Sequence, residues 1–451
     1  MDVPITVLGD ESSIHSLQSY DAILEASTLM SVKECLMNPQ SNRPMIGAVM
    51  DALTLWYLIT KEDYNIPKED FMDSQLRITA VDSASTLDER LKSHGVPRFS
   101  GRALFSAILP PDFFYQSGNV LILNGVLKRG VISKQHIGTD TGSMIQYILD
   151  RYGPNRAAEF ITDLCFVAAR MFDTMQFTIG IDDCSPENKS YKQDIDKVIT
   201  KLRLQIKSLG NPSVNPVEED YREKQTLAFI GSALNEIGNI VSKAFDVDYE
   251  TKMKAYKAAL QTTEADPNVL PVSGEMPHEN AIRTMANSGA KGTKFHLTQI
   301  AAIVGQQYIR GQRFQPSISK KTRCLPYFEK GDTSPESRGL CLNSYTEGLD
   351  PAQFVFASAA GRENMVDIAV RTSESGATNH KIIKALENIV VGYDGSLRNV
   401  TGTLFTPVYG DDGFDPSHLK IVRGPTNTFP SFIDLKNVSG TINARFGAYP
   451  K

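Results

Sequence analysis

Apolar residues recur at helical spacing along several stretches of the chain, and shorter apolar runs lie between these stretches. Helical spacing predicts helices over residues 16–37, 45–60 and 142–177. Residues 100–136 have the pattern of strands, and Val120–Leu123 and Val126–Leu127 flank Asn124-Gly125, a strong hairpin signal. The pattern as a whole predicts an α+β fold that is mostly helical.

Two longer amphipathic helices are predicted between residues 186 and 259. Their apolar positions fall three and four residues apart, at Ile195, Val198, Ile199, Leu202, Ile206 and Leu209 in the first helix and at Leu227, Ile230, Leu234, Ile237 and Val241 in the second. Gly210-Asn211-Pro212 ends the first helix. The short polar connection predicts an antiparallel helical hairpin whose apolar faces form a packing seam. An acidic, proline-containing loop is predicted over residues 262–279.

Residues 350–391 carry the longest helix signal. Asp350-Pro351 is a capping residue followed by a proline at the first helical position, and Gly392 lies where a C-terminal glycine is expected. These ends allow one helix of about 41 residues, which would be about 60 Å long. Its middle, residues 371–381, is polar on every side, which is typical of a helix anchored at both ends that crosses a wet space. Because Gly376 weakens a helix by about 1 kcal/mol relative to Ala, two helices broken there are an equal alternative.

Charge is distributed unevenly along the chain. The net charge is −5, which taken alone argues against a protein that coats nucleic acid. Residues 280–328 contain no Asp or Glu, and their eight basic residues are Arg283, Lys291, Lys294, Arg310, Arg313, Lys320, Lys321 and Arg323. This stretch, which we call the basic stretch, predicts contact with phosphates or nucleic acid, with a solvated basic face as the alternative. SGAKGTK at 288–294 lacks the spacing of a phosphate-binding P-loop.

Length and cysteine content limit the class of protein. The 451 residues suggest roughly three domains. The five cysteines form no CxxC pair, so no zinc site or disulfide scaffold is expected, and reduced thiols favour an intracellular protein. No secretory signal and no apolar stretch of membrane-spanning length is present, so no membrane partner is expected.

Several distinctive motifs occur in a fixed order along nearly the whole chain. They are PQSNRPMIGAVMDAL at 39–53, FTIGIDD at 177–183, NSGAKGTKFHLTQIAAIVGQQYIRGQRF at 287–314, the run over 325–376, YDGSLRN at 393–399 and YGDDGFDP at 409–416. In this order they resemble the largest subunit of multisubunit DNA-directed RNA polymerases, of the eukaryotic RNA polymerase II and large-DNA-virus type.

The resemblance implies an internal segment of that subunit, whose double-psi-barrel type of fold includes a pore, a funnel with a helical hairpin, and a long bridge helix. The implied parts are a remnant of the active-site domain at 1–38, a pore domain at 39–183, a funnel domain at 184–348 with the basic stretch, the bridge helix at 349–392, and the start of a cleft or foot region at 393–451.

The resemblance also implies nucleotidyl transfer, in which the 3′-hydroxyl of RNA attacks the α-phosphate of a nucleoside triphosphate and pyrophosphate leaves. The implied catalytic residues are Arg362, Asp367, Arg371, Thr372, Ser373 and Glu374. Residues implied along the path of nucleotides and nucleic acid are Lys291, Gln306, Gln307, Arg310, Arg313, His380 and Lys381. Thr372 and Ser373 match positions that pack against the incoming nucleotide–template pair. Ala377 stands where cellular polymerases often have an aromatic residue, which puts stacking on the template there in doubt.

The metal motif of the family, NADFDGDE, is only partly present. Aligned without gaps, Gly9-Asp10-Glu11 match its GDE, and Thr6 and Leu8 replace two of its three aspartates. Asp10 alone cannot hold Mg²⁺, so the resemblance implies Mg²⁺ in the assembled enzyme, with Asp10 as a remnant of the motif. The chain also ends before a trigger loop. We therefore expect a segment of a split largest subunit, produced by splicing or as a separate polypeptide, without activity alone.

The resemblance implies a large set of partners. They are the remaining parts of the largest subunit, the second-largest subunit, small polymerase subunits, the DNA template, the RNA transcript and nucleoside triphosphates. An intracellular location follows, in the host nucleus, the cytoplasm or a virion if the protein is viral. The alternative is a non-catalytic nucleic-acid-binding protein or a decayed polymerase fragment. An unrelated phosphate-binding enzyme would explain the basic stretch but not the ordered motifs.

Overall fold

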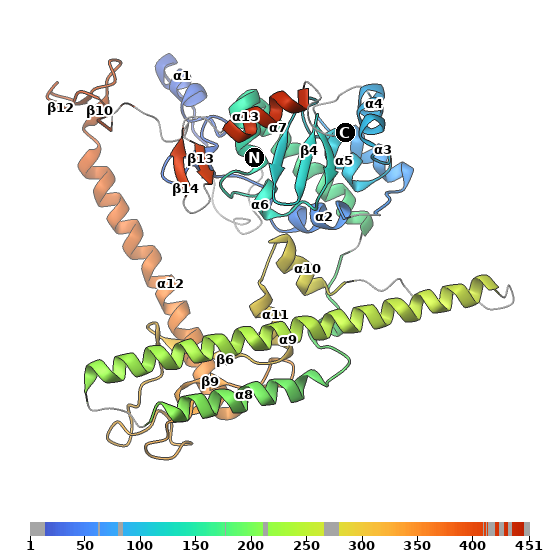
Figure 1. The fold of residues 1–451 in the computed structure, drawn as a ribbon. Helices are drawn as coiled ribbons and strands as arrows, with labels where there is room; N and C mark the ends of the chain where they lie inside the picture. The colour runs from blue at the N-terminus through green and yellow to red at the C-terminus, as the bar shows by residue number, and fades with distance from the viewer. Residues whose placement is uncertain are drawn as a thin grey trace. The chain divides into compact units, whose positions relative to one another are not determined.

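The computed structural model describes residues 14–61, 64–79, 84–175, 177–210, 215–265, 279–408, 410–411, 413, 420–423, 428–431 and 435–445. Over these residues the fold is α+β and mostly helical, as predicted, with small antiparallel sheets (Figure 1). The chain forms two compact units: unit 1 is Met1–Thr174 with Asp415–Lys451, and unit 2 is Met175–Phe414. None of the helices in the described ranges is both long and apolar enough to cross a membrane.

Unit 1 begins with short elements where the apolar spacing predicts long helices. Helix α1 (Tyr20–Thr28) starts where Ser19 accepts a hydrogen bond from an amide, but it ends early because none of its apolar side chains is buried in a core. Helix α2 (Asp51–Ile59) starts only after Met50, whose φ of 50° is incompatible with a helix. The helix predictions are therefore wrong for residues 16–19, 29–37 and 45–50. Strands β1 (Met37–Asn38) and β2 (Arg43–Pro44) form an antiparallel pair between the two helices.

The core of unit 1 is built on a three-stranded sheet and the helices around it. These elements are α3 (Lys68–Leu76), α4 (Ala84–His94), α5 (Gly101–Ala107), β3 (Tyr115–Ser117), β4 (Val120–Leu123), β5 (Val126–Arg129) and α6 (Lys134–Ile137). The predicted hairpin is confirmed, because β4 and β5 meet at Asn124-Gly125, whose φ angles are 49° and 68°. The strand prediction is wrong for α5, where Ser100 caps a helix whose Phe105 packs edge-on against Trp56. It is also wrong for residues 134–136, which belong to α6.

His136 lies in α6 and closes the first turn of that helix. Its Nδ1 accepts a hydrogen bond from the amide of Ser133 (3.1 Å), which only a neutral imidazole can do. Burial lowers the pKa of His136 from 6.5 to about 4. Between these values the unfolded chain binds a proton that the folded chain does not. We therefore expect the free energy of unfolding to be greatest above pH 6.5 and to fall by about 3 kcal/mol towards pH 4.

Thermal unfolding at a series of pH values measures this loss, and His136→Gln is the matched control. Glutamine keeps an acceptor at the third helical position but does not titrate. We expect the variant to lose the stability change that the wild type shows between pH 6.5 and 4. A variant with the same pH profile as the wild type would show that other groups cause the loss.

Helix α7 (Met144–Met175) occupies the predicted range 142–177, with a kink that the apolar spacing does not indicate. Gly153 has a φ of 84° and Pro154 follows it, so the backbone leaves the helical path at this point. The end of the chain adds three further elements to unit 1, which are β13 (Lys420–Arg423), β14 (Thr428–Ser431) and α13 (Leu435–Arg445).

Helix α13 packs closely against β3 at Gly440. A Cβ at this position would lie 2.0 Å from the ring of Phe114, so the contact requires glycine unless the ring moves. We expect Gly440→Ala to weaken the docking of α13 by about 1–3 kcal/mol. Hydrogen exchange over residues 435–445 measures the effect, and Ser439→Ala at an exposed position is the control. Equal exchange in both variants would rule out the close contact.

Unit 2 contains the predicted helical hairpin, formed by α8 (Tyr191–Ser208) and α9 (Pro216–Ala265) (Figure 1). The packing seam is confirmed, because the apolar faces of both helices belong to one buried core. Its members on the two helices are Tyr191, Ile195, Val198, Ile199, Leu202, Ile206, Ile230, Ala233, Ile237, Val241 and Phe245. The predicted loop is wrong for residues 262–265, which continue α9, and residues 266–278 lie outside the described residues.

Short elements of unit 2 pack against this hairpin, several of them through its buried core. They are η2 (Ile181–Cys184), α10 (Ala281–Ser288), α11 (Lys294–Ala301), β6 (Gly305–Gln306), β7 (Tyr308–Ile309), β8 (Gln312–Arg313), η3 (Glu336–Arg338) and β9 (Leu340–Cys341). Strand β6 pairs with β9, and β7 pairs with β8, all antiparallel. The buried carboxylate of Asp183 accepts hydrogen bonds from the amides of Ala281 (2.8 Å) and Gly180 (2.9 Å), which ties η2 to the start of α10.

The long helix is a single element, α12 (Pro351–Leu386), so the alternative of two helices broken at Gly376 is wrong. Its 36 residues give a length of about 54 Å. It ends before the expected Gly392 because Ile389–Val391 forms strand β10, in keeping with the strand preference of β-branched residues. Strand β10 pairs with β11 (Leu397–Asn399), and β11 pairs with β12 (Leu404–Thr406).

Candidate functional site

Helix α12 is anchored in unit 2 at its first turns. Ala352 and Phe356 are its buried residues, and the ring of Phe356 lies 4.5 Å from that of Phe314 and 6.0 Å from that of Phe328, between centroids. Beyond this base the described side chains of the helix are exposed or half-buried. Its exposed large apolar side chains are Phe354, Val355, Met365, Val366, Ile368, Val370, Ile382, Ile383 and Leu386. The surface of α12 is therefore available to a partner on several sides.

The candidate catalytic residues lie along this exposed surface. Arg371 forms an ion pair with Asp367 one turn earlier (2.8 Å), and both side chains are mostly exposed. The hydroxyl of Thr372 donates to the carbonyl of Ala369 (3.0 Å). The other candidates on the helix are exposed, namely Arg362, Ser373, Glu374, His380 and Lys381. The exposed ion pair adds less than about 1 kcal/mol to stability, so these side chains remain available for contact with a ligand.

Gln306 ends β6 and Gln307 follows it, and β9, the strand that pairs with β6, contacts α12. The side chain of Gln306 is buried, and its Nε2 donates to the carbonyls of Gln307 and Arg338, both at 2.8 Å. Gln307 is half-buried, and its Nε2 donates to the carbonyl of Gly305 (3.4 Å). Gln306 thus holds two loops together within unit 2, while part of Gln307 faces outwards.

The basic stretch meets acids that lie elsewhere in the chain. The ion pairs are Arg283 with Asp246, Arg313 with Glu223, and Arg310 with Glu363. The Arg313 side chain is buried where it pairs with Glu223, whereas 90% of the Arg310 side chain is exposed. Lys291, Lys294, Lys320 and Lys321 are exposed. The positive surface is therefore smaller than the count of eight basic residues indicates.

Glu223 is the residue of this region that the sequence did not reveal. It lies in α9, far from the basic stretch in sequence, and its carboxylate contacts both Arg313 and Arg338. No spacing or local motif marks it among the other acidic residues of α9. Only the fold, which lays β8 and η3 against α9, brings the three side chains together.

The described residues do not provide a metal site. Within these ranges, no three His, Cys, Asp or Glu side chains are grouped so that they could hold a metal ion. Asp10, the predicted remnant ligand, lies outside the described residues. None of the five cysteines forms a disulfide bond, and burial raises the pKa of the Cys341 thiol to about 11. Magnesium therefore does not fit the donor set that the structure describes.

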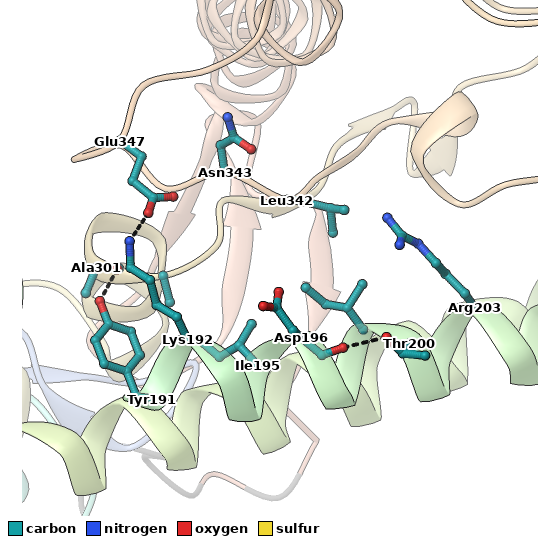
Figure 2. A pocket seen from close by; sticks show the side chains of 12 residues that line it. Tyr191, Lys192, Ile195, Asp196, Thr200, Arg203, Ala301, Leu342, Asn343 and Glu347 are labelled. Carbon is teal, nitrogen blue, oxygen red and sulfur yellow. Dashed lines mark hydrogen bonds and ion pairs between the residues drawn. The ribbon is translucent and has the colours of Figure 1, made fainter. Parts of the chain in front are cut away.

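A separate hollow of about 420 Å³ lies between α8, the end of α11 and the segment 342–347 (Figure 2). At one end, Lys192 forms an ion pair with Glu347, and the hydroxyl of Tyr191 donates to the carbonyl of Ala301 (3.1 Å). The Glu347 carboxylate raises the pKa of Lys192. Figure 2 shows Asp196 and Arg203 rising from α8 on the side of Lys192. None of the candidate catalytic residues lines this hollow.

Comparisons with known proteins match most of the chain. Models of one family match in order: RNA polymerase Rpb1 domain 3 over residues 35–184, domain 4 over 221–341 and domain 5 over 348–445. The chain is 30% identical over 423 residues to DNA-directed RNA polymerase subunit Rpo1N of Halobacterium salinarum, covering 90% of this chain and 40% of that protein.

Two further relatives agree with these matches. The Rpo1N subunit of Thermococcus celer is 30% identical over 445 residues, covering 90% of this chain and 46% of that subunit. The RNA polymerase II subunit RPB1-B of Trypanosoma brucei brucei is 29% identical over 431 residues, covering 91% of this chain and 22% of that subunit. The chain spans less than half the length of each of these curated relatives. Matched in order by three successive domains of one family, the chain belongs to the Rpb1 family, the largest subunit of DNA-directed RNA polymerase.

Proposed function

We propose that this chain forms part of the nucleotide-addition centre of a DNA-directed RNA polymerase. The observation that carries the proposal is α12, a continuous helix anchored at its first turns, whose polar middle stands exposed. Such a surface suits a ligand that is both flat and charged, such as a base pair with its phosphates. The reaction is attack of an RNA 3′-hydroxyl on the α-phosphate of a nucleoside triphosphate, with pyrophosphate leaving.

Different residues of α12 contact different parts of such a ligand. Thr372 and Ser373 are small and pack against the incoming nucleotide–template pair. Arg371 lies near the template backbone, and its pairing with Asp367 sets its direction (2.8 Å). Arg362, Glu374 and Lys381 contribute charge on either side, and His380 contributes a polar ring. The exposed lysines of the basic stretch and Arg310, with Gln307, lie along the path of the triphosphates. Arg313 and Gln306 support this path from within, because both are buried.

The remaining parts of the enzyme come from other chains. Magnesium ions that serve the reaction are held by another part of the polymerase. The partners are the rest of the largest subunit, the second-largest and small subunits, the DNA template and the RNA transcript. The exposed apolar side chains of α12 and of β10–β12 are surfaces that these subunits cover. Such an enzyme works inside the cell, where its DNA template lies, and a source among large DNA viruses stays a prediction.

A reconstitution experiment tests this function. The chain is assembled with the other polymerase subunits, and extension of an RNA primer on a DNA template is measured with all four nucleoside triphosphates. We expect extension by the complete assembly and none by the purified chain. An assembly prepared without this chain is the control. Equal extension by that control, or extension by the chain alone, would contradict the proposal.

A further inference from the structure

The carboxylate of Glu223 lies between two arginines from different segments of unit 2. Its Oε2 accepts a hydrogen bond from Arg313 Nε (2.9 Å), its Oε1 accepts one from Arg313 Nη2 (2.8 Å), and Oε1 also contacts Nη1 of Arg338. Only 4% of the Arg313 side chain, 13% of Arg338 and 18% of Glu223 is exposed. Because the three groups are largely removed from water, their charges interact more strongly than surface pairs do.

The segment that carries Arg313 contacts α12 directly. Arg313 ends the β7–β8 hairpin, and in the turn of that hairpin the amide of Arg310 donates to both carboxylate oxygens of Glu363 on α12 (3.1 and 2.9 Å). Phe314, the next residue after Arg313, packs against Phe356 at the base of α12. Arg313, whose guanidinium Glu223 holds, thus lies within three residues of two contacts with α12.

The segment that carries Arg338 leads to the same helix. It continues into β9, where the thiol of Cys341 lies 3.6 Å from the carbonyl of Gln353 on α12. The amide of Asn343 donates to Oε1 of Gln353 (3.3 Å). The carbonyl of Arg338 accepts the hydrogen bond from Gln306 that joins the two segments (2.8 Å). The carboxylate of Glu223 on α9 therefore binds both segments that contact the first half of α12.

We propose that Glu223 is a positioning residue for nucleotide addition, which fixes the direction of α12 relative to the α8–α9 hairpin of unit 2. The inference rests on the proposed function only for its effect on the reaction. Glutamine at this position keeps the shape of the side chain but removes the charge, so two buried guanidinium groups would face a neutral amide. The hairpin β7–β8 would then lose its fixed support on α9, and α12 would lose its fixed direction.

Hydrogen exchange in the assembled polymerase gives the first test, which needs no catalytic activity. We expect Glu223→Gln to speed exchange of the amides of Arg310 and of residues 352–363 about tenfold, and Glu223→Asp, which keeps the charge, to restore part of the protection. Val241→Ala is the control, because it weakens the same helical hairpin at a buried site distant along α9. Unchanged exchange in Glu223→Gln, or the same pattern in Val241→Ala, would overturn the proposal.

The rate of single-nucleotide addition by the same assemblies gives the second test. We expect Glu223→Gln to lower kcat about tenfold with little change in KM, since no bound nucleotide contact is lost. Glu363→Gln should produce a similar fall, and the double variant should fall no further, because both act through the β7–β8 hairpin. If the falls in kcat of the two single variants multiplied in the double variant, Glu223 and Glu363 would not act through the same hairpin, and this part of the proposal would be overturned. If the wild-type assembly makes no RNA, the proposed function fails, while the exchange result still decides whether Glu223 directs α12.

Discussion

Replacing Gly376 by proline should abolish RNA synthesis by the assembled polymerase, with a fall of more than about 100-fold in the rate of nucleotide addition. Gly376 lies inside α12, between the candidate residues Glu374 and His380. Proline removes a backbone hydrogen bond and clashes with the preceding turn, at a cost of about 3 kcal/mol or more. The helix would bend at this point, so the exposed polar middle would no longer present one continuous surface. Primer extension with the purified assembly measures the rate.

Gly376→Ala is the matched control for this change. A Cβ at this position meets nothing within 4 Å, and alanine favours a helix by about 1 kcal/mol relative to glycine. The alanine variant should therefore keep α12 intact, as judged by hydrogen exchange of residues 370–382. We expect its rate to stay within about tenfold of the wild type. Normal synthesis by Gly376→Pro would show that a continuous α12 is not needed for the reaction.

The elements that the sequence predicted well are those whose signal is local. The α8–α9 hairpin followed from apolar residues at fixed spacing, and most of these residues belong to the buried seam. The start of α12 followed from Asp350-Pro351, a capping signal that depends on neighbouring residues alone. The hairpin at Asn124-Gly125 followed from a pair of residues that tolerate positive φ. Each of these features is decided within a few turns or residues of chain.

The errors arose where tertiary contacts decide the outcome. The apolar spacing over residues 16–37 indicated a helix longer than α1, but no side chain of α1 is buried, and Leu29 and Met30 after it are exposed. Val390 and Val391 could have extended α12, but pairing with β11 draws them into a sheet. Propensity is a weak signal in both places, because packing against distant residues outweighs it.

The charges of the candidate site also depend on tertiary contacts that the sequence does not show. Counting basic residues over 280–328 predicted a phosphate-binding surface, and the count was correct. The count did not show that Asp246, Glu223 and Glu363 approach from other helices and pair with three of these residues. The positions of candidate residues along α12 followed from motif order, whereas the buried support by Glu223 required the fold.

Loss of the aromatic anchor should have the second largest effect. Phe356 is 1% exposed and lies against the rings of Phe314 and Phe328, whereas Phe354, two residues earlier, is 62% exposed. We expect Phe356→Ala to cost about 3–5 kcal/mol, because it removes a buried ring and leaves a cavity at the base of α12. Native-state hydrogen exchange of residues 352–360 measures the free energy of local opening.

Phe354→Ala is the control for Phe356→Ala. It separates the loss of the buried Phe356 anchor from the general effect of removing a ring from α12. In the purified chain it should change local opening by less than about 0.5 kcal/mol, because its ring is exposed and buries little surface. In the assembled polymerase both variants lose a ring, but only Phe356→Ala frees the helix base. If the two variants opened equally in the purified chain, α12 would not be held by its first turns. The contacts through Arg310 and Gln353 would then be the ones that hold α12. The direction of α12 would then depend on a partner bound to its exposed polar surface.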